Sequence, residues 1–309
     1  MNYLPFLQLI RWKNLVILAA TLLIIKFGFI NIFTTNYSLD YLRFVILLAS
    51  IISIAAAGYI INDIYDIEID QINKPYKLVI GKVFTISQAY NMYFIFNIFG
   101  VLMGFYLANY LEKPIYSGLF IMTSFLLYYY SSTLKKVPLI GNIVVASLIG
   151  FCILLCAYFD LIINTSTANL GMHYLLFELI LEFSVFAFLI NLIREIVKDI
   201  EDIKGDKELN IKTLPLLIGI KYSKYVIGLF TLILIISILY FTFSYIPRSS
   251  FIFYYFLLAI FLPLLYFIFR LRKSKTKTDY SLLSKILKFC MITGILSILL
   301  ISLTIKNVI

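Results

Sequence analysis

Charged residues are scarce in this sequence. Only 14% of the 309 residues are Asp, Glu, Lys or Arg, whereas soluble domains carry about 25%, and 62% of the residues are hydrophobic. The deficit extends over many apolar runs along the chain instead of marking a single anchor. This composition excludes a soluble globular protein and predicts an integral membrane protein that crosses the bilayer several times.

Histidine and cysteine are almost absent as well. The only histidine, His173, lies well away in sequence from the three cysteines, Cys152, Cys156 and Cys290, each of which falls in an apolar run. Cys152 and Cys156 are four residues apart and could form a metal-binding pair on one helix, but the histidine is too distant to join them. We therefore expect the thiols to pack as apolar side chains.

Long apolar runs are what the sequence has in abundance. A membrane-spanning helix needs about 20 mainly apolar residues. Nine segments meet this requirement, namely residues 15–33, 41–61, 87–109, 114–131, 139–159, 173–194, 222–243, 251–271 and 284–304. The sequence thus predicts one all-α membrane domain, residues 1–309, built as a bundle of nine transmembrane helices.

Positive charges lie mainly in alternate loops of this predicted bundle. Of the 26 Lys and Arg residues, 21 fall on one side, and the exceptions are Lys26, Arg43, Lys113, Arg248 and Lys306. Cytoplasmic loops are enriched in this way, so the net charge of +10 indicates membrane orientation rather than nucleic-acid binding. We expect the N-terminus in the cytoplasm and the C-terminus outside.

The acidic residues gather in two motifs with the same spacing. Each motif has three aspartates at positions i, i+3 and i+7 behind a long apolar segment, and the second motif follows 136 positions after the first. On a helix this spacing places the three carboxylates on one face, where they repel one another. The six residues are Asp63, Asp66, Asp70, Asp199, Asp202 and Asp206.

The two motifs follow the second and the sixth predicted helices. Both helices run towards the cytoplasm, so both acidic ends lie on the same side of the membrane and can converge on one site. The repetition also predicts two similar blocks of four helices, with one further helix at the end. A divalent cation is the obvious group to offset the repulsion within each motif.

Carboxylates at this density are suited to a hard cation. Mg²⁺ takes oxygen ligands and is usually bound by one or two carboxylates together with substrate phosphates. Two facing aspartate clusters can therefore hold a diphosphate through bridging Mg²⁺, and nearby basic residues can contact its oxygens directly. These basic residues are Lys74, Lys77, Lys135, Lys136, Arg194 and Lys198.

The substrate that fits this arrangement is an apolar molecule with a diphosphate head. Its tail would lie among the helices and its head at the cytoplasmic rim. If the diphosphate leaves, an allylic carbocation remains, and aromatic faces stabilise cations. Tyr65 and the run Tyr128, Tyr129 and Tyr130 lie near the rim and are candidates for contacting the substrate.

At these residues the sequence resembles the UbiA family of membrane prenyltransferases. The family pattern Asn-Asp-x-x-Asp-x-x-x-Asp matches residues 62–70, and a second Asp-rich motif matches residues 199–206. The resemblance implies transfer of an isoprenoid chain from its diphosphate to an acceptor, with Mg²⁺ as cofactor held by the six aspartates. It also implies a set of residues that orient the diphosphate, namely Asn62, Lys77, Lys135, Arg194 and Lys198.

The sequence motifs indicate the prenyl diphosphate donor more clearly than they indicate the acceptor. Residues 194–202 and 212–215 are most similar to the geranylgeranylglycerol-phosphate geranylgeranyltransferase branch, which implies a lipid-like glycerol phosphate acceptor. The Arg-Pro pairs usual in the family are replaced by Arg11-Trp12 and by Lys77-Leu78. An aromatic acceptor such as 4-hydroxybenzoate is therefore the alternative, and a transporter is a remote one because the acids lie at one rim rather than at the midplane.

Two further acids lie inside the sixth apolar segment, away from the motifs. Glu178 and Glu182 are four residues apart and nearer the opposite face of the membrane. Acids within a membrane segment are functional candidates by default. Their distance from the proposed site favours ion pairs with Lys26 or Arg43 on neighbouring helices, and a polar tunnel or an acceptor contact is the alternative.

Overall fold

The computed structural model describes residues 3–76, 78–209, 211–246 and 251–306, and within these ranges the chain is helical apart from its loops and one isolated bridge between Ile80 and Phe84. The helices, including short 3-10 and π-helical turns labelled η, are α1 (Leu4–Leu9), α2 (Trp12–Ile25), η1 (Lys26–Ile30), α3 (Asn31–Phe33), α4 (Tyr41–Tyr65), α5 (Ile67–Asn73), α6 (Ile86–Tyr110), η2 (Pro114–Tyr116), α7 (Ser117–Ser132), η3 (Leu134–Lys136), α8 (Ile140–Ala157), η4 (Tyr158–Ile162), α9 (Leu170–Glu201), α10 (Ile203–Glu208), α11 (Leu214–Tyr245), α12 (Phe251–Tyr255), η5 (Phe256–Phe261), α13 (Leu262–Lys273) and α14 (Lys277–Lys306).

Eight helical spans of the described chain are long and apolar enough to cross a membrane. They correspond to eight of the nine segments expected from the sequence. The remaining segment, residues 114–131, forms η2 followed by α7, which has 16 residues. Because a helix rises about 1.5 Å per residue, α7 is about 24 Å long, shorter than a typical hydrocarbon core of about 30 Å.

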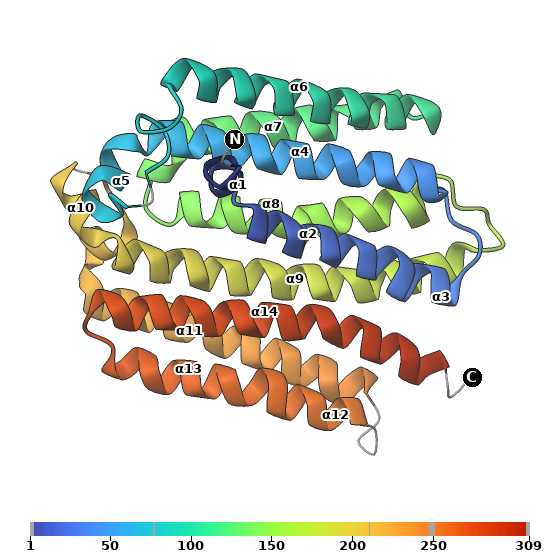
Figure 1. The fold of residues 1–309 in the computed structure, drawn as a ribbon. Helices are drawn as coiled ribbons and strands as arrows, with labels where there is room; N and C mark the ends of the chain where they lie inside the picture. Colours follow the sequence, from blue (N-terminus) through green and yellow to red (C-terminus); the bar gives the residue numbers. More distant parts are fainter. Residues whose placement is uncertain (1–2, 77, 210, 247–250, 307–309) are drawn as a thin grey trace.

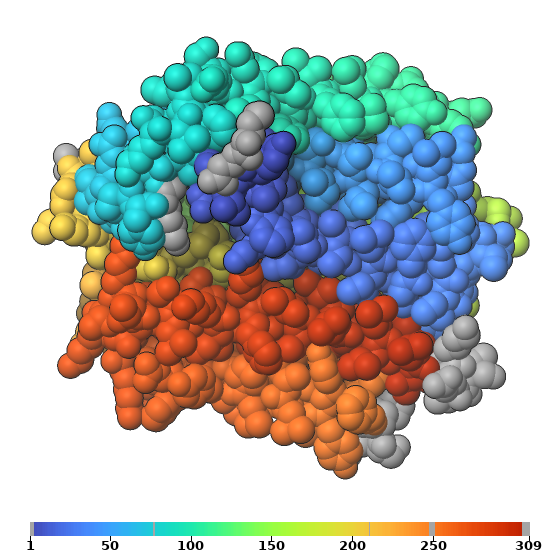
Figure 2. Space-filling view, in the orientation of Figure 1, coloured from blue at the N-terminus to red at the C-terminus, as the bar shows by residue number. Residues whose placement is uncertain are grey.

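The helices lie side by side with their axes roughly aligned, and the short helices α5 and α10 gather at one end of the bundle (Figure 1). The two halves are built around α4 and α9. The first packs against α6 and α7, and the second packs against α8, α11 and α14. On one face the N-terminal helices meet the C-terminal helices, as the blue and red surfaces in Figure 2 show. The ends of α4 and α9, where the acidic motifs begin, therefore lie at the same end of the molecule.

The opposite end contains a buried ion pair that the sequence did not predict. The Nζ of Lys26, in η1, lies 2.8 Å from each carboxylate oxygen of Asp160, in η4, and both side chains are fully buried. Arg43 pairs instead with Asp40, the residue that caps the N-terminus of α4. The prediction that these two basic residues pair with acids of α9 is wrong, because closer carboxylates already neutralise them.

The two acids of α9 lie elsewhere. Glu178 is exposed on the outside of the bundle and Glu182 is half-buried. Within the part of the chain that the structure describes, neither residue makes an ion pair or lines the main cavity. The alternative expectation, a contact with the acceptor through that cavity, therefore has no geometric support.

Candidate active site

Each acidic motif forms a hinge between a long helix and a short one. Asp66 separates α4 from α5, and Asp202 separates α9 from α10. The backbone angles of the two residues are nearly the same, with φ −98° and ψ 4° at Asp66 and φ −100° and ψ 8° at Asp202. The prediction that each motif lies on one face of a continuous helix is wrong, because the helix breaks at the middle aspartate.

The electrostatics of helix ends explain why the chain breaks there. Carboxylates near a helix C-terminus oppose the helix dipole, whereas carboxylates in a first turn are favoured. The break at the first hinge places Glu68 and Asp70 in the first turn of α5, and the break at the second places Asp206 in the first turn of α10. At each hinge, carboxylates that would extend the C-terminus of a long helix lie instead in the first turn of a short one, where the helix dipole favours them.

The two hinges contact one another directly. The side-chain amide of Asn73, at the end of α5, donates to the backbone oxygen of Asp202 at 2.9 Å, and its oxygen accepts from the backbone N–H of Gly205 at 3.0 Å. A Cβ atom at Gly205 would lie only 2.4 Å from the amide nitrogen of Asn73, so the contact requires glycine. The Lys74 side chain pairs with the Asp202 carboxylate. The structure thus brings together two motifs that are far apart in the sequence.

The aspartates of the first hinge have basic or amide partners. Arg11 donates to Asp63 Oδ1 at 2.7 Å. Asp66 accepts from the side-chain amide of Asn62 at 2.7 Å and also pairs with Lys135 from η3. Asn62 and Lys135 therefore lie beside a carboxylate of the first motif, and their predicted contact with the diphosphate stays a prediction.

The second hinge is less fully compensated. Asp199 accepts from Asn142 of α8 at 2.9 Å. Asp202 pairs with Lys74 through one oxygen, but its other oxygen, Oδ1, is buried and has no hydrogen-bond partner among the described residues. A buried carboxylate oxygen without a partner is costly. This oxygen is available to a ligand that the protein itself does not supply.

Crowding of the carboxylates changes their proton affinity. Burial raises the pKa of the Asp206 carboxyl to about 6, Lys135 partly offsets the rise, and the charges of Asp202 and Asp66 add to it. Burial also raises the pKa of Asp70, followed in effect by the charge of Asp66. Burial alone would lower the pKa of Lys135, but the Asp66 carboxylate outweighs it and raises that pKa. Burial is thus the main reason why the pKa values of Asp206 and Asp70 are raised, and the neighbouring carboxylates add to it.

The donor set fits Mg²⁺, although the carboxylates are not assembled around an ion. In the described ranges, no three His, Cys, Asp or Glu side chains stand close enough together to hold a metal. The cationic side chains of Arg11, Lys74 and Lys135 instead occupy oxygens of the motif carboxylates. Carboxylate oxygens are the ligands that Mg²⁺ prefers, and the buried Oδ1 of Asp202 lacks a partner. The six aspartates are thus chemically suited to the ion.

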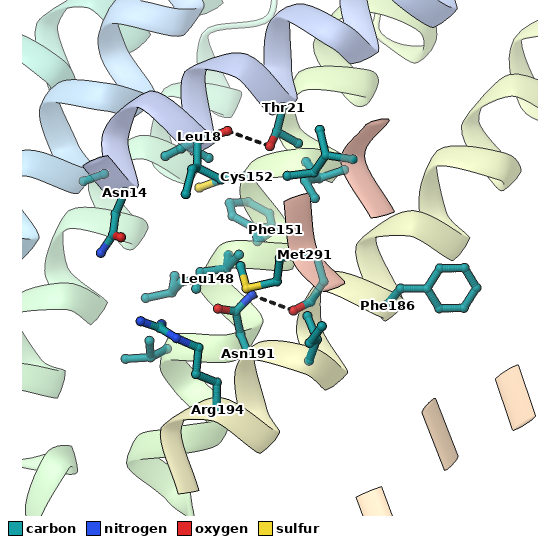
Figure 3. A pocket seen from close by; sticks show the side chains of 18 of the residues that line it. Asn14, Leu18, Thr21, Leu148, Phe151, Cys152, Phe186, Asn191, Arg194 and Met291 are labelled. Carbon is teal, nitrogen blue, oxygen red and sulfur yellow. Dashed lines mark hydrogen bonds between the residues drawn. The ribbon is translucent and has the colours of Figure 1, made fainter. Parts of the chain in front are cut away.

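A cavity of about 280 Å³ lies in the apolar interior of the bundle, and none of the six motif aspartates is among the described residues that line it. Asn62 connects it to the first hinge, because this side chain lines the cavity and donates to Asp66. Half of the residues that line it are Ile, Leu or Phe, among them Phe151 and Phe186 (Figure 3). Its polar wall is formed by Arg11, Asn14, Tyr59, Asn62, Tyr130, Asn191, Arg194, Glu195, Lys198 and Lys288. A long apolar molecule with a charged head matches this division.

Most of the predicted substrate-binding residues lie at this cavity or beside it. Asn62, Arg194 and Lys198 line the wall, and Lys135 lies at the first hinge. Lys77 lies outside the residues that the structure describes. Of the four tyrosines expected near the rim only Tyr130 lines the cavity, whereas the others, Tyr65, Tyr128 and Tyr129, are exposed on the outer surface.

Several residues that the structure brings into the site belong to no motif that indicates a functional role from the sequence. They are Arg11, Asn14, Asn73, Asn142, Glu195, Gly205 and Lys288. Asn142 and Lys288 carry the clearest signal, because a polar or charged residue inside an apolar segment usually has a specific partner. The others lie in short polar stretches, where many residues would have been equally good candidates.

The chain matches known proteins along most of its length. A family model described as the UbiA prenyltransferase family matches residues 13–292. A digeranylgeranylglyceryl phosphate synthase of Saccharolobus solfataricus is 32% identical over 302 residues, which are 97% of each chain. A protein of the same name from Methanobrevibacter smithii is 29% identical over 71% of each chain.

Solved structures share the fold. A structure described as a digeranylgeranylglyceryl phosphate synthase in membranes has a TM-score of 0.63 and 26% identity, over 98% of this chain and 100% of that one. A UbiA homologue from Archaeoglobus fulgidus bound to DMAPP and Mg²⁺ has a TM-score of 0.59 and 15% identity, over 95% of this chain and 98% of that one. At this lower identity the second likeness concerns the fold alone.

Proposed function

Because this chain belongs to the UbiA prenyltransferase family, we propose that it transfers a geranylgeranyl group from its diphosphate to the hydroxyl of geranylgeranylglyceryl phosphate. The observation that carries the proposal is that the two acidic hinges contact one another beside an apolar cavity, whose polar wall includes Asn62 and Lys198, four residues before Asp66 and Asp202. The relative from Saccharolobus solfataricus, similar over nearly its whole length, supports the glycerol phosphate acceptor.

The proposed reaction exchanges one C–O bond for another. The bond between C1 of the prenyl chain and the diphosphate breaks, and its electron pair leaves with the diphosphate. The acceptor hydroxyl forms the new bond to C1 and gives up its proton. Mg²⁺, when bound by the six motif aspartates, would neutralise the diphosphate and make it a better leaving group.

Residues of the chain position the donor in this scheme. Lys135 and Lys74, which now pair with the hinge carboxylates, supply positive charge to the leaving diphosphate. Asn62, Arg194 and Lys198, which line the cavity wall, orient it. The apolar wall holds the prenyl chain and excludes water, which would otherwise capture the carbocation.

We further propose the membrane arrangement predicted from the loop charges. The N-terminus and both hinges then face the cytoplasm. With α7 counted as a short ninth span between α6 and α8, each hinge ends an even-numbered helix of one membrane domain. The matching backbone angles at Asp66 and Asp202 support a duplicated pair of four-helix blocks.

The test of the function is a product analysis. Purified protein in detergent receives Mg²⁺, geranylgeranyl diphosphate and a mixture of geranylgeranylglyceryl phosphate and 4-hydroxybenzoate, and lipid products are identified by mass spectrometry. We expect a diether phosphate. A prenylated aromatic acid would assign the chain to the alternative acceptor class, and the absence of any prenylated product would refute the proposal.

The aspartates are tested in the same assay. Asp66→Asn and Asp202→Asn should each lower turnover by about 10²-fold or more, because each removes a carboxylate that would hold Mg²⁺ against the diphosphate. Matched controls lie on the same two long helices, away from the hinges: Asp40→Asn at the start of α4 and Glu178→Gln on α9. Retention of most activity in either hinge variant would contradict the assignment of the motifs.

A further inference from the structure

The polar wall of the cavity has an excess of positive charge. Among the described residues that line it, four are basic, namely Arg11, Arg194, Lys198 and Lys288, and Glu195 alone is acidic. Glu195 accepts from Lys198 at 2.7 Å and lies 3.6 Å from Arg194. Arg11 is neutralised from outside this wall by Asp63. One cation, Lys288, has no carboxylate partner in the described part of the chain.

Lys288 instead contacts a neutral side chain. Its Nζ, on α14, donates to the side-chain oxygen of Asn14, on α2, at 3.2 Å. Lys288 is half-buried and lines the same cavity wall as Arg194. Like charges at the edge of an apolar cavity are costly because the surroundings screen them poorly. An anion between them would remove this cost.

A second observation points to a missing anionic ligand at the same wall. The Nε of Arg194 is buried and has no hydrogen-bond partner among the described residues. The guanidinium group extends into the cavity next to Leu148 (Figure 3). A buried N–H without an acceptor is normally satisfied in the functional state. The Nε of Arg194 is therefore open to the donor diphosphate that the proposed function assigns to it, whereas Lys288 on the same wall keeps no carboxylate partner among the described residues.

We propose that Lys288, together with Asn14, binds the phosphate monoester of the lipid acceptor. This inference rests on the proposed function and adds a separate acceptor site to it. The Lys288–Asn14 pair joins α2 to α14, whereas the lysines on the hinge carboxylates come from η3 and from the residue after α5. The two sets of cations thus belong to different elements and can hold two different anionic groups.

This placement has a chemical consequence for the acceptor. The hydroxyl that reacts and the phosphate are attached to the same glycerol unit. A phosphate held by Lys288 keeps the acceptor hydroxyl within the length of one glycerol unit of this lysine. Such positioning favours attack of the hydroxyl on C1 over attack by water. Asn14 can donate its amide to the phosphate while Lys288 supplies the charge. A neutral acceptor of the same shape would lose both contacts.

The experiment compares two acceptors and two lysines of one helix. Steady-state kinetics are measured for Lys288→Met with geranylgeranylglyceryl phosphate and with geranylgeranylglycerol, which lacks the phosphate. The matched control is Lys285→Met, at an exposed position of α14. We expect Lys288→Met to raise the KM for the phosphorylated acceptor about tenfold or more and to leave the neutral acceptor and the donor nearly unchanged. Lys288→Arg should restore much of the loss.

A binding measurement separates this inference from the proposed reaction. The chain has a single tryptophan, Trp12, two residues before Asn14, so its fluorescence can report acceptor binding without turnover. Wild-type protein should bind the phosphorylated acceptor at least about tenfold more tightly than Lys288→Met does. Failure to form any diether product while this difference persists would refute only the proposed function.

Three results would overturn the phosphate site. One is equal binding of the phosphorylated acceptor by wild type and Lys288→Met. Another is a rise in the donor KM instead of the acceptor KM, which would assign Lys288 to the diphosphate. The third is an equal loss for both acceptors, which would indicate that Lys288 only joins α2 to α14. Asn14→Ala, which removes the partner while keeping the charge, gives a second variant if Lys288→Met does not fold.

Discussion

Two lysine–aspartate pairs lie at opposite ends of the bundle and differ in how completely they are enclosed. Lys26 and Asp160 have no exposed side-chain surface, whereas Lys135 and Asp66 retain 28% and 8% of theirs. The first pair joins two π-helical turns, η1 and η4, far from the acidic hinges. The second lies at the hinge between α4 and α5. The same two residue types thus occupy a sealed site and an accessible one.

The partners around each pair explain what each can do. Lys26 also donates to the backbone oxygen of Leu39 at 2.7 Å and lies 3.7 Å from the ring centre of Tyr37, and Asp160 accepts from the backbone N–H of Leu39 at 3.1 Å. Every strong donor and acceptor there has a fixed partner, so the pair can only hold the fold together. The Lys135–Asp66 pair is surrounded by other carboxylates and can exchange partners when a more highly charged ligand enters.

The largest effect on stability is expected when the enclosed ion pair between Lys26 and Asp160 is broken. Lys26→Met leaves the Asp160 carboxylate buried without its counter-charge, which should lower the free energy of unfolding by about 3–5 kcal/mol. Thermal unfolding of the detergent-solubilised protein measures the loss. The double variant Lys26→Met, Asp160→Leu removes both charges and should be clearly more stable than Lys26→Met alone. A double variant no more stable than the single one would show that the ion pair itself stabilises the fold.

Breaking the Lys135–Asp66 pair should instead lower turnover strongly and stability only a little. Lys135→Met removes a cation that the diphosphate site needs, so turnover should fall by about 10²-fold. The unfolding temperature should fall less than in Lys26→Met, because the buried Asp66 carboxylate keeps Asn62 as a donor. Activity assays and thermal unfolding on the same preparation test both statements. A large loss of stability with normal turnover per folded molecule would place Lys135 with Lys26 as a structural residue.

The smallest expected effect concerns the joint between the hinges. Asn73→Ala removes two hydrogen bonds that connect α5 to α10, so the two aspartate motifs should lose their alignment while each keeps its carboxylates. We expect a fall in turnover of about tenfold, since small misplacements of reacting groups are costly. Gly205→Ala disturbs the same contact by crowding Asn73 and should act in the same direction. Wild-type turnover in both variants would show that the hinges align without this contact.

The local features of the site could be predicted because they depend on short stretches of sequence. The apolar segments, the two aspartate motifs and the basic residues beside them follow from hydropathy and spacing alone. Their convergence also followed, because both motifs end helices that run in the same direction. The continuous helix through Asp66 and Asp202 was predicted wrongly, since spacing alone does not reveal how the dipole at a helix end disfavours further carboxylates.

Partners that lie far apart in the chain could not be predicted in the same way. Lys26 was expected to pair with an acid of α9, but it pairs with Asp160, because the π-helical turns η1 and η4 bring these two side chains together. The contact of Lys288 with Asn14 joins residues 274 positions apart. In both cases the sequence offers several acceptable partners, and only the packing of the helices selects one.

The sequence by itself determined that this protein is a helical membrane protein with two acidic motifs, each behind a long apolar segment. Hydropathy and residue spacing are properties of short stretches of the chain, so they are the same in any arrangement of the helices. The tertiary structure decided which carboxylates are compensated, which cation is left for a second anion and where an apolar chain can lie. Those outcomes depend on distances between helices, because electrostatic and hydrogen-bonding energies change within a few ångströms.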